Sequence, residues 1–384
     1  MRRGRIFPAI HLAALVVAGL ACGPGTARLQ DETPPAGLTP QEAEPPVSVT
    51  EEVLDFVVVT HLEPEFHFYD PSGGLVETRS AEGLGWSRPN TAQVVGNAVY
   101  YVAAGDADQG EVVRRVTSTG TTDLDFTRAQ SFSGLTFAVS AEGGRIAWTK
   151  TDWDGQAPFS QLWVADVDGA SPILVAETDA ADDIAEYYVL EAVAWLGDGD
   201  LIYAWQVTGI GGYILFFGWS SLYRYDLATG VAVALAPVEM DVTAPCWSDM
   251  TPDGAYVLGA CGGPAQIVER AAATGVETLF PLLPDQGQAG AAAYSPSGDG
   301  LAYAIARGNP DDEAGQVVLL ADRGGAPTAI ARHTPGAFDS VFWVDKSRMV
   351  VGYWQGEQAF VDMLTIDGVR SPIGAGQLVG VHLP

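Results

Sequence analysis

The sequence predicts an all-β protein in which short strands form repeated four-stranded units closed into a ring. Two hairpin phrases alternate along residues 53–384, and each is a strand, a turn rich in Gly, Asp or Asn, and a second strand. The two phrases differ in number by one, and one unpaired strand is left at each end of this region. We therefore expect seven units, with six as the alternative if one unit is divided wrongly, and almost no helix.

The first phrase has a β-branched and aromatic second arm, as a half-buried strand requires. Gly, Asp and Asn occupy its turn because they tolerate positive φ or bond their own backbone. Its copies are SAEGGRIAW (140–148), WLGDGDLIY (195–203), TPDGAYVLG (251–259), SPSGDGLAY (295–303), WVDKSRMVV (343–351) and the shorter VVGNAVYY (94–101).

The second phrase often has an Asp before its turn, where the carboxylate can cap backbone N–H groups; we expect this of Asp70, Asp166 and Asp226. Its seven copies outnumber the six first phrases. They cover residues 66–78, 111–126, 161–176, 221–235, 266–280, 316–331 and 360–374.

The surplus second phrase is the N-terminal one, and only one strand, DFVVVTH (55–61), precedes it. The last second phrase is followed by one further strand, GQLVGVHL (376–383). We expect this C-terminal strand to complete the first unit and close the ring, which removes exposed strand edges.

The first phrase resembles SPDGKRLAY, the repeat of TolB-type propeller proteins. The resemblance covers residues 53–384 and implies a β-propeller, seven-bladed by the count above, with each unit forming one blade. It says little about activity, because one fold serves many functions.

The N-terminal residues 1–21 read as a signal peptide. Arg2, Arg3 and Arg5 precede an apolar run, residues 10–20, that is too short to span a bilayer. GLAC (19–22) resembles a bacterial lipobox, which implies lipidation of Cys22; a plain secretory signal is the alternative. Residues 22–52 are rich in Pro and Glu and predict a disordered tether. We expect an exported lipoprotein on the periplasmic or outer side of a bacterial membrane, bound through its lipid only.

The charge is strongly acidic, with 48 Asp and Glu against 19 Lys and Arg and a formal net charge of −29. Such a surface repels nucleic acid and anionic lipid. It suits cations or basic partners, or serves only as a solubilising coat. Cys246 and Cys261 lie symmetrically about the turn at Asp253 and Gly254, so we expect them to oppose each other and form a disulfide in an oxidising compartment.

Loops on one face of the ring carry the candidate binding residues. Three of these loops are acidic, and the segment 205–221 is long, Gly-rich and apolar; the alternative for its aromatic rings is packing between blades. A divalent cation could bind the first loop, although solvated carboxylates are the commoner explanation. The candidates for the binding face are Asp106, Asp108, Glu111, Asp152, Trp153, Asp154, Tyr213, Phe216, Phe217 and Trp219, and those for the metal are His61, Glu63, Glu65 and His67.

The sequence contains none of GxSxG, HExxH, CxxC or a Walker loop. It favours a monomeric, non-catalytic scaffold that binds an envelope protein or a small ligand through the loop face, and it indicates no catalytic residue and no cofactor. A metal-assisted, lactonase-like hydrolase is the alternative, with Asp249 as the main acidic residue of the inner strands. A third interpretation, a sensor with a small molecule in the channel, is not separated from the first.

Overall fold

We analysed a computed structural model of the chain. It describes residues 56–60, 64–84, 91–104, 110–129, 134–153, 158–178, 188–197, 199–207, 218–237, 246–260, 266–280, 288–306, 316–322, 325–333 and 337–382. The chain divides into two units, residues 1–51 and 52–384, and the described residues all belong to the second.

The described strands pair into seven antiparallel four-stranded sheets, named here in chain order from the innermost strand outward. Sheet 1 is β28 (Gln377–His382), β1 (Phe56–Thr60), β2 (Glu65–Tyr69), β3 (Leu75–Ser80); sheet 2 is β4 (Ala92–Val95), β5 (Ala98–Ala104), β6 (Glu111–Thr117), β7 (Gly120–Asp123); sheet 3 is β8 (Phe137–Val139), β9 (Arg145–Trp153), β10 (Pro158–Asp166), β11 (Ile173–Glu177). Sheet 4 is β12 (Tyr188–Leu196), β13 (Asp200–Val207), β14 (Leu222–Asp226), β15 (Val231–Ala236); sheet 5 is β16 (Cys246–Met250), β17 (Tyr256–Ala260), β18 (Val268–Ala271), β19 (Glu277–Leu279). Sheet 6 is β20 (Gln288–Tyr294), β21 (Gly300–Ala306), β22 (Gln316–Asp322), β23 (Thr328–His333); sheet 7 is β24 (Ala337–Trp343), β25 (Arg348–Gln355), β26 (Gln358–Thr365), β27 (Arg370–Ala375).

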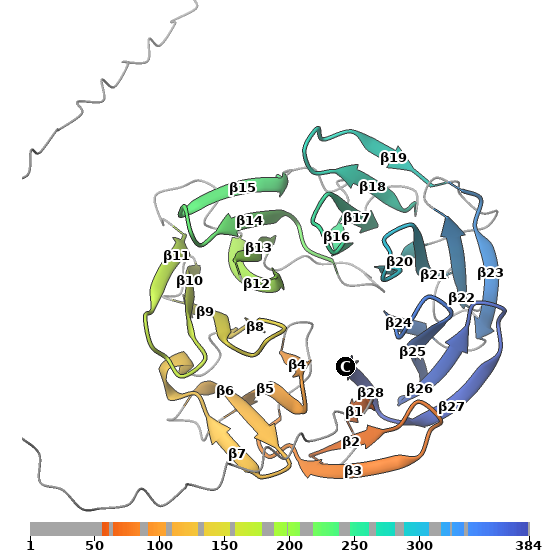
Figure 1. Ribbon diagram of the computed structural model, residues 1–384, viewed down its shortest axis with the longest axis horizontal. Helices are drawn as coiled ribbons and strands as arrows, with labels where there is room; N and C mark the ends of the chain where they lie inside the picture. Colours follow the sequence, from red (N-terminus) through yellow and green to blue (C-terminus); the bar gives the residue numbers. More distant parts are fainter. Residues whose placement is uncertain are drawn as a thin grey trace, which may run out of the picture. The chain divides into compact units, whose positions relative to one another are not determined.

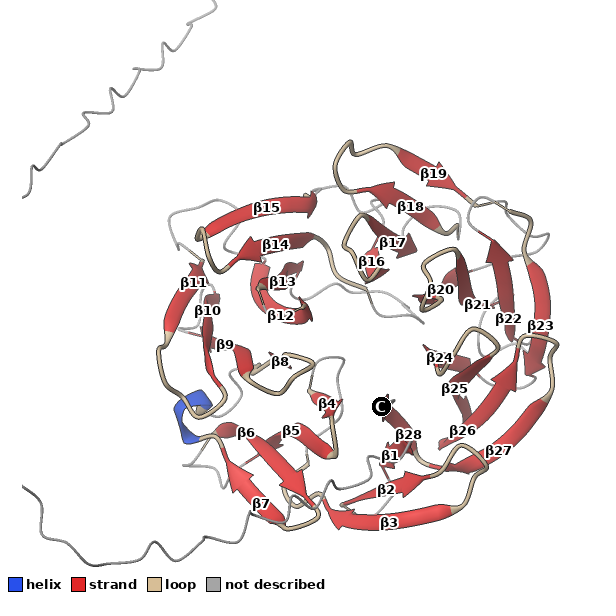
Figure 2. Ribbon diagram, viewed as in Figure 1, coloured by secondary structure: helices blue, strands red, loops and turns tan. Residues whose placement is uncertain are grey.

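The sheets stand side by side around a central axis, each with its first strand nearest the centre (Figure 1). This arrangement is a β-propeller, so the predicted all-β propeller fold is confirmed. The one helix among the described residues is the short 3₁₀ turn η1 (Asp125–Thr127), drawn in blue in Figure 2. In the same part of the chain, no helix has the length and apolar character needed to cross a membrane.

The C-terminal strand occupies the innermost place of sheet 1, as the sequence predicts. β28 runs antiparallel to β1, with Val57 opposite Val381 and Val58 opposite Gly380. Leu378 is 8% exposed and packs in one apolar cluster with Val57 and Val59. The two ends of the described chain therefore hold each other by main-chain pairing and by shared core.

The hydrophobic core is divided among the interfaces between neighbouring sheets. One cluster joins Leu258 and Phe280 of the sheet 5 region to Tyr303 of sheet 6, and another joins Phe66 of sheet 1 to Tyr101 of sheet 2. Large apolar side chains are needed at each interface because twisted sheets fan outward and leave space to fill. This explains why the second arm of the first phrase is aromatic or β-branched.

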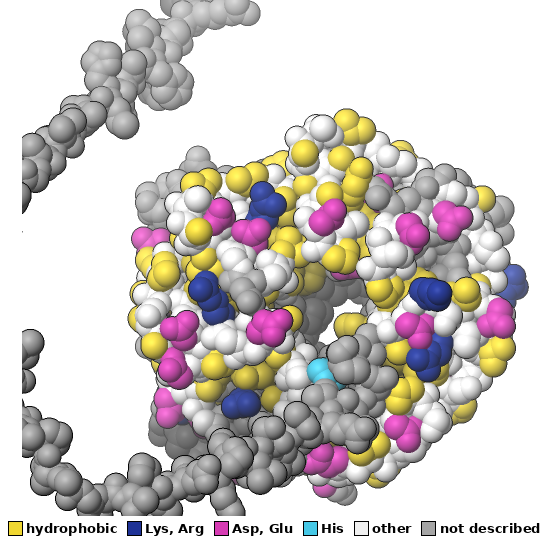
Figure 3. Space-filling model, viewed as in Figure 1, with side chains coloured by type: hydrophobic (Ala, Val, Ile, Leu, Met, Phe, Trp, Pro, Cys, Tyr) yellow, Lys and Arg dark blue, Asp and Glu magenta, His cyan; other side chains and the backbone are white. Residues whose placement is uncertain are grey.

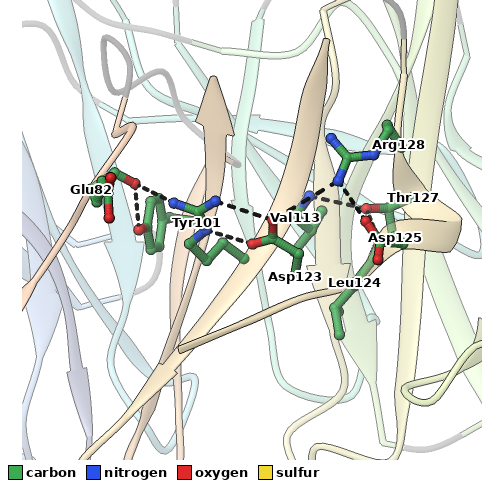
Figure 4. A network of polar contacts seen from close by, with 9 residues as sticks. Glu82, Tyr101, Val113, Asp123, Leu124, Asp125, Thr127 and Arg128 are labelled. Carbon is green, nitrogen blue, oxygen red and sulfur yellow. Dashed lines mark hydrogen bonds and ion pairs between the residues drawn. The ribbon is translucent and has the colours of Figure 1, made fainter. Parts of the chain in front are cut away.

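A polar network ties the outer part of sheet 2 to the chain that enters it (Figure 4). Arg114 donates through Nε to Asp123 Oδ1 at 2.5 Å and through Nη1 to the carbonyl oxygen of Glu82 at 2.8 Å. The Tyr101 hydroxyl donates to the same carbonyl at 2.8 Å. The hydrogen bond from Arg114 lowers the pKa of Asp123. The ion pair of Arg114 and Asp123 therefore helps to hold the outer strands of sheet 2 against the chain at Glu82.

Two of the three predicted turn caps are present. Asp70 Oδ1 accepts hydrogen bonds from the N–H groups of Ser72 and Gly74, and Asp226 Oδ1 accepts from Ala228 and Thr229. The prediction for Asp166 is wrong. Asp168, inside the turn, accepts instead from the N–H of Ala170 at 2.9 Å.

The predicted opposition of Cys246 and Cys261 requires a correction. Met250 faces Val257, as the symmetry about the turn predicts, but a bulge between Trp247 and Asp249 shifts the register. Cys246 consequently faces Ala260, the neighbour of Cys261. Cys261 itself lies outside the described residues, so the disulfide stays a prediction.

Candidate functional site

The centre of the ring contains a cavity of about 830 Å³. All seven innermost strands contribute to its wall, and Figure 3 shows the ring hollowed at its centre. This volume lies in the range of small-molecule sites. Its polar lining includes Gln93, Ser248, Asp249, Ser295, Asp339, Ser340 and Gln377, and its aromatic lining is Phe137, Trp219, Tyr294, Phe342 and Trp343.

Side chains of the innermost strands fix this wall by bonding the backbone of a neighbouring sheet. The Gln93 amide spans to Val139, donating to its carbonyl at 2.9 Å and accepting from its N–H at 2.8 Å. The Trp195 indole donates to the Ala138 carbonyl at 3.0 Å, and the Trp343 indole donates to that of Ala293 at 3.1 Å. Such links hold the positions of neighbouring strands and make the wall rigid.

β-bulges interrupt five of the innermost strands. The register against the neighbouring strand of the sheet shifts in β12, β16, β20, β24 and β28. In β20 the bulge places Ala291 at φ 48°, a left-handed conformation that is uncommon for a residue with a side chain. A bulge turns the following side chains to the opposite face and often lies beside a functional site. These five bulges thus influence which side chains face the cavity.

Asp249 lies just beyond the bulge in β16 and lines the cavity. Its Oδ2 accepts the N–H of Tyr294, in the neighbouring β20, at 2.7 Å. Burial raises the pKa of Asp249 to about 6, and the hydrogen bond from Tyr294 opposes this shift. Asp249 as a residue is half-buried, and protein surrounds its carboxylate closely enough to disfavour the charge.

Asp339 is the bulged residue of β24 and also lines the cavity. The hydroxyl of Ser340 donates to its Oδ1 at 2.8 Å and the indole of Trp354 to its Oδ2 at 2.7 Å. Burial raises the pKa of Asp339 above its ordinary value, against the effect of both hydrogen bonds. The sequence does not single out this residue, although one acid in a strand that is otherwise apolar except for Ser340 is a signal that marks it.

The predicted loop-face residues are only partly within the described chain. Asp152 is exposed on β9, whereas Glu111 begins β6 and accepts the N–H of Leu135 at 3.1 Å. The backbone of Trp153 ends β9. Outside the described residues lie Cys22, Cys261, Asp106, Asp108, Asp154, Tyr213, Phe216 and Phe217.

Trp219 is packed between two sheets, as the alternative interpretation of segment 205–221 expects. It is 9% exposed and belongs to a core cluster with Leu222 and Trp247. Its indole donates to Glu191 at 3.1 Å. Trp219 is nevertheless among the residues that line the central cavity.

Two of the four predicted metal ligands are described, and they lie together. His67 Nε2 and Glu65 Oε2 are 3.1 Å apart on β2. Across the described parts of the chain, no group of three or more His, Cys, Asp or Glu side chains is arranged to hold a metal ion. His61 and Glu63 fall outside those parts, so the four-ligand site stays a prediction.

No family model matches the chain, and no curated protein matches it in sequence. Solved structures do resemble it. A protein from Lactobacillus plantarum is 15% identical over 85% of this chain and 97% of its own, with a TM-score of 0.54. TolB from Acinetobacter baumannii is 13% identical over 84% of this chain and 80% of its own, with a TM-score of 0.45.

A prolyl endopeptidase is 18% identical over 77% of this chain, with a TM-score of 0.49. This chain spans 42% of that enzyme's length. Likeness at these identities shows the fold alone. The chain is a β-propeller, and TolB proteins are among the propellers that it resembles.

Proposed function

We propose that this chain is an exported, lipid-anchored β-propeller that binds an envelope protein through the loop face of its ring. The observation that supports this most directly is the end of the β9–β10 hairpin. Asp152 and Phe159 lie directly opposite each other there. Asp152 is exposed and Phe159 is 38% exposed, while Thr151 and Ser160, the next pair inward, are buried.

An exposed aromatic ring beside a carboxylate, carried on a rigid hairpin, is suited to protein contact. Aromatic residues are enriched where protein interfaces bury surface, and a negative charge favours a basic partner. The hairpin is held at its base because the Ser160 hydroxyl accepts the N–H of Leu190 in the neighbouring sheet, at 3.1 Å. The pair is therefore presented in a fixed position.

Site-specific photo-crosslinking in the native envelope tests this proposal. A crosslinker at Phe159 should capture one predominant protein, and adding Asp152→Asn should reduce the yield. The matched control is a crosslinker at Leu75, which is 55% exposed on the outermost strand β3. Equal capture at both positions, or none at Phe159, contradicts a contact surface at this hairpin.

The anchoring part of the proposal is supported by the sequence of residues 1–22. Metabolic labelling with an alkyne fatty acid should label the wild-type protein, and Cys22→Ser should remove both the label and membrane association. Persistence of membrane association in the variant would point to a different anchor.

We also propose that the ring has seven blades. The pairing of the described strands into seven four-stranded sheets supports one blade for each sheet, with β28 completing the first. An experimental structure at a resolution that separates strands tests the count, and six blades remain the alternative outcome.

One observation favours a hydrolase-like propeller as the second candidate. Two carboxylates, Asp249 and Asp339, line the central cavity, whereas the sequence singles out Asp249 as the main acidic residue of the inner strands. Ester, lactone and peptide substrates, assayed with and without added divalent cations, test this candidate. If one of these substrates is turned over, and Asp249→Asn or Asp339→Asn abolishes that turnover, the hydrolase candidate would replace the scaffold proposal.

A further inference from the structure

The central cavity has a charge pattern that the proposed scaffold function does not use. Asp249 and Asp339 come from β16 and β24, which flank β20 in the ring. Among the described residues that line the cavity, none is Lys, Arg or His. This described wall thus carries two acidic groups and no basic one, in a chain whose formal net charge is −29.

Both carboxylates are held by neutral donors. The Tyr294 N–H donates to Asp249, and the Ser340 hydroxyl and the Trp354 indole donate to Asp339. Neither acid forms an ion pair with a described residue. Burial alone disfavours their charge, and low-dielectric walls strengthen the attraction of each carboxylate for a cation that would offset this cost.

The remainder of the wall is apolar and partly aromatic. Phe342 is 39% exposed although it stands on an innermost strand, so part of its ring faces the cavity that it lines. Trp343 beside it is fixed by its hydrogen bond to Ala293. An aromatic face attracts a cation and covers an apolar group. The exposed part of the Phe342 ring is therefore available for contact with a ligand in the cavity.

These features together specify the ligand class. An anion would meet two carboxylates without a basic partner among the described lining residues. A divalent metal prefers six or more oxygen ligands, or a compact His and Cys set, and no three-residue group of that kind occurs among the described residues. An ammonium group with an apolar body matches both the charge and the aromatic lining, and it fits within about 830 Å³.

We propose that the central channel binds a small organic ammonium ion, with Asp249 and Asp339 as its charge partners and Phe342 against its apolar part. This site is separate from the hairpin at Phe159, so it neither depends on the envelope partner nor implies one. A ligand in the channel would make contacts with several blades at once, because each innermost strand belongs to a different sheet.

Calorimetric titration of the full-length protein tests the proposal with matched probes. The cations are 2-phenylethylammonium and benzyltrimethylammonium; 2-phenylethanol is the neutral analogue and 3-phenylpropionate the anionic one. At least one cation should bind about tenfold or more tightly than the neutral analogue, since charged hydrogen bonds and ion pairs are the stronger contacts. The anion should not bind.

Variants then locate the site. Asp249→Asn and Asp339→Asn keep an oxygen acceptor and nearly the same shape, and each should weaken cation binding about tenfold. Phe342→Ala should weaken it by a smaller factor. Asp322→Asn, at an exposed position at the end of β22, is the matched control and should bind as the wild type does. Circular dichroism and thermal melting confirm that each variant is folded.

Three results would overturn this inference: saturable binding by neither cation, equal affinity for charged and neutral probes, or wild-type affinity in both Asn variants. Each is independent of the crosslinking result at Phe159. Failure of the channel site therefore leaves the scaffold proposal standing, and the reverse also holds.

Discussion

Trp219 and Trp247 exchange two backbone hydrogen bonds, at 2.7 and 2.8 Å, although one precedes β14 of sheet 4 and the other lies in β16 of sheet 5. This bridge brings the main chains of two neighbouring sheets into direct contact. Gly218 permits the approach, because a Cβ atom at that position would lie 2.5 Å from the Cβ of Cys246. The end of the long apolar segment is thus joined to the innermost strand of the next sheet.

Gly218→Ala is expected to destabilise the protein. The added methyl group must push the chain away from Cys246, and overpacking of this kind costs about 1–3 kcal/mol. Urea unfolding followed by tryptophan fluorescence measures the loss. Gly144→Ala is the matched control, because a Cβ there meets nothing within 4 Å. Equal stability of the two variants would show that the sheets do not approach this closely.

Leu378→Ala tests ring closure by β28. The side chain is 8% exposed and packs with Val57 and Val59 of β1, so its removal should cost about 2–5 kcal/mol of unfolding free energy. Leu75→Ala is the same substitution in the same sheet at a position that is 55% exposed, and it should change stability by less than about 0.5 kcal/mol. Similar melting of the two variants would mean that β28 does not close the ring.

The sequence was sufficient to predict the architecture because the information for each hairpin is local. Turn residues and alternating apolar positions recur in every unit, and the mismatch between phrase counts indicates where β28 must pair. The residues that line the cavity are harder to predict from the sequence. Asp339 faces the cavity at a bulge, and a bulge arises from packing between sheets rather than from alternation along one strand.

The same limit explains why the predicted position of Cys246 directly opposite Cys261 is wrong. Symmetry about the turn at Asp253 holds as far as Asp249, which pairs with Leu258, and fails beyond the bulge at Ser248. The loop-face residues present a different limit. Their chemistry can be read from composition, but which of them lie together depends on contacts between blades that no local pattern encodes.

A disulfide between Cys246 and Cys261 stays a prediction that mass spectrometry can test directly. Cys246 faces Ala260, which directly precedes Cys261 in the sequence, and a disulfide requires the two Cα atoms to lie within about 7 Å of each other. Non-reducing digestion of the exported protein should yield one linked peptide pair, and Cys246→Ser with Cys261→Ser should lower thermal stability. Two alkylatable thiols in the denatured, unreduced protein would contradict the bridge.

Asp249 should make stability decrease between about pH 4 and pH 6. Its pKa rises from 3.8 to about 6 on folding, so in this interval the folded state holds a proton that the unfolded state has released. Stability from this group is therefore present below about pH 4 and is lost as the pH rises through 6. Asp249→Asn removes the buried charge and should stabilise the protein at pH 7 by about 1–3 kcal/mol relative to its effect at pH 4.

Asp345→Asn provides a comparison of opposite sign. Burial raises the pKa of Asp345, but the hydrogen bonds from Ser347 and Arg348 outweigh it and bring the pKa to about 2. Its contribution is present above pH 3.8 and is lost as the pH falls toward 2, so this variant should be less stable than the wild type at pH 7. Urea unfolding of all three proteins from pH 2 to pH 7 measures both effects. A difference between Asp249→Asn and the wild type that stays constant across this range would show that the channel carboxylate is not desolvated.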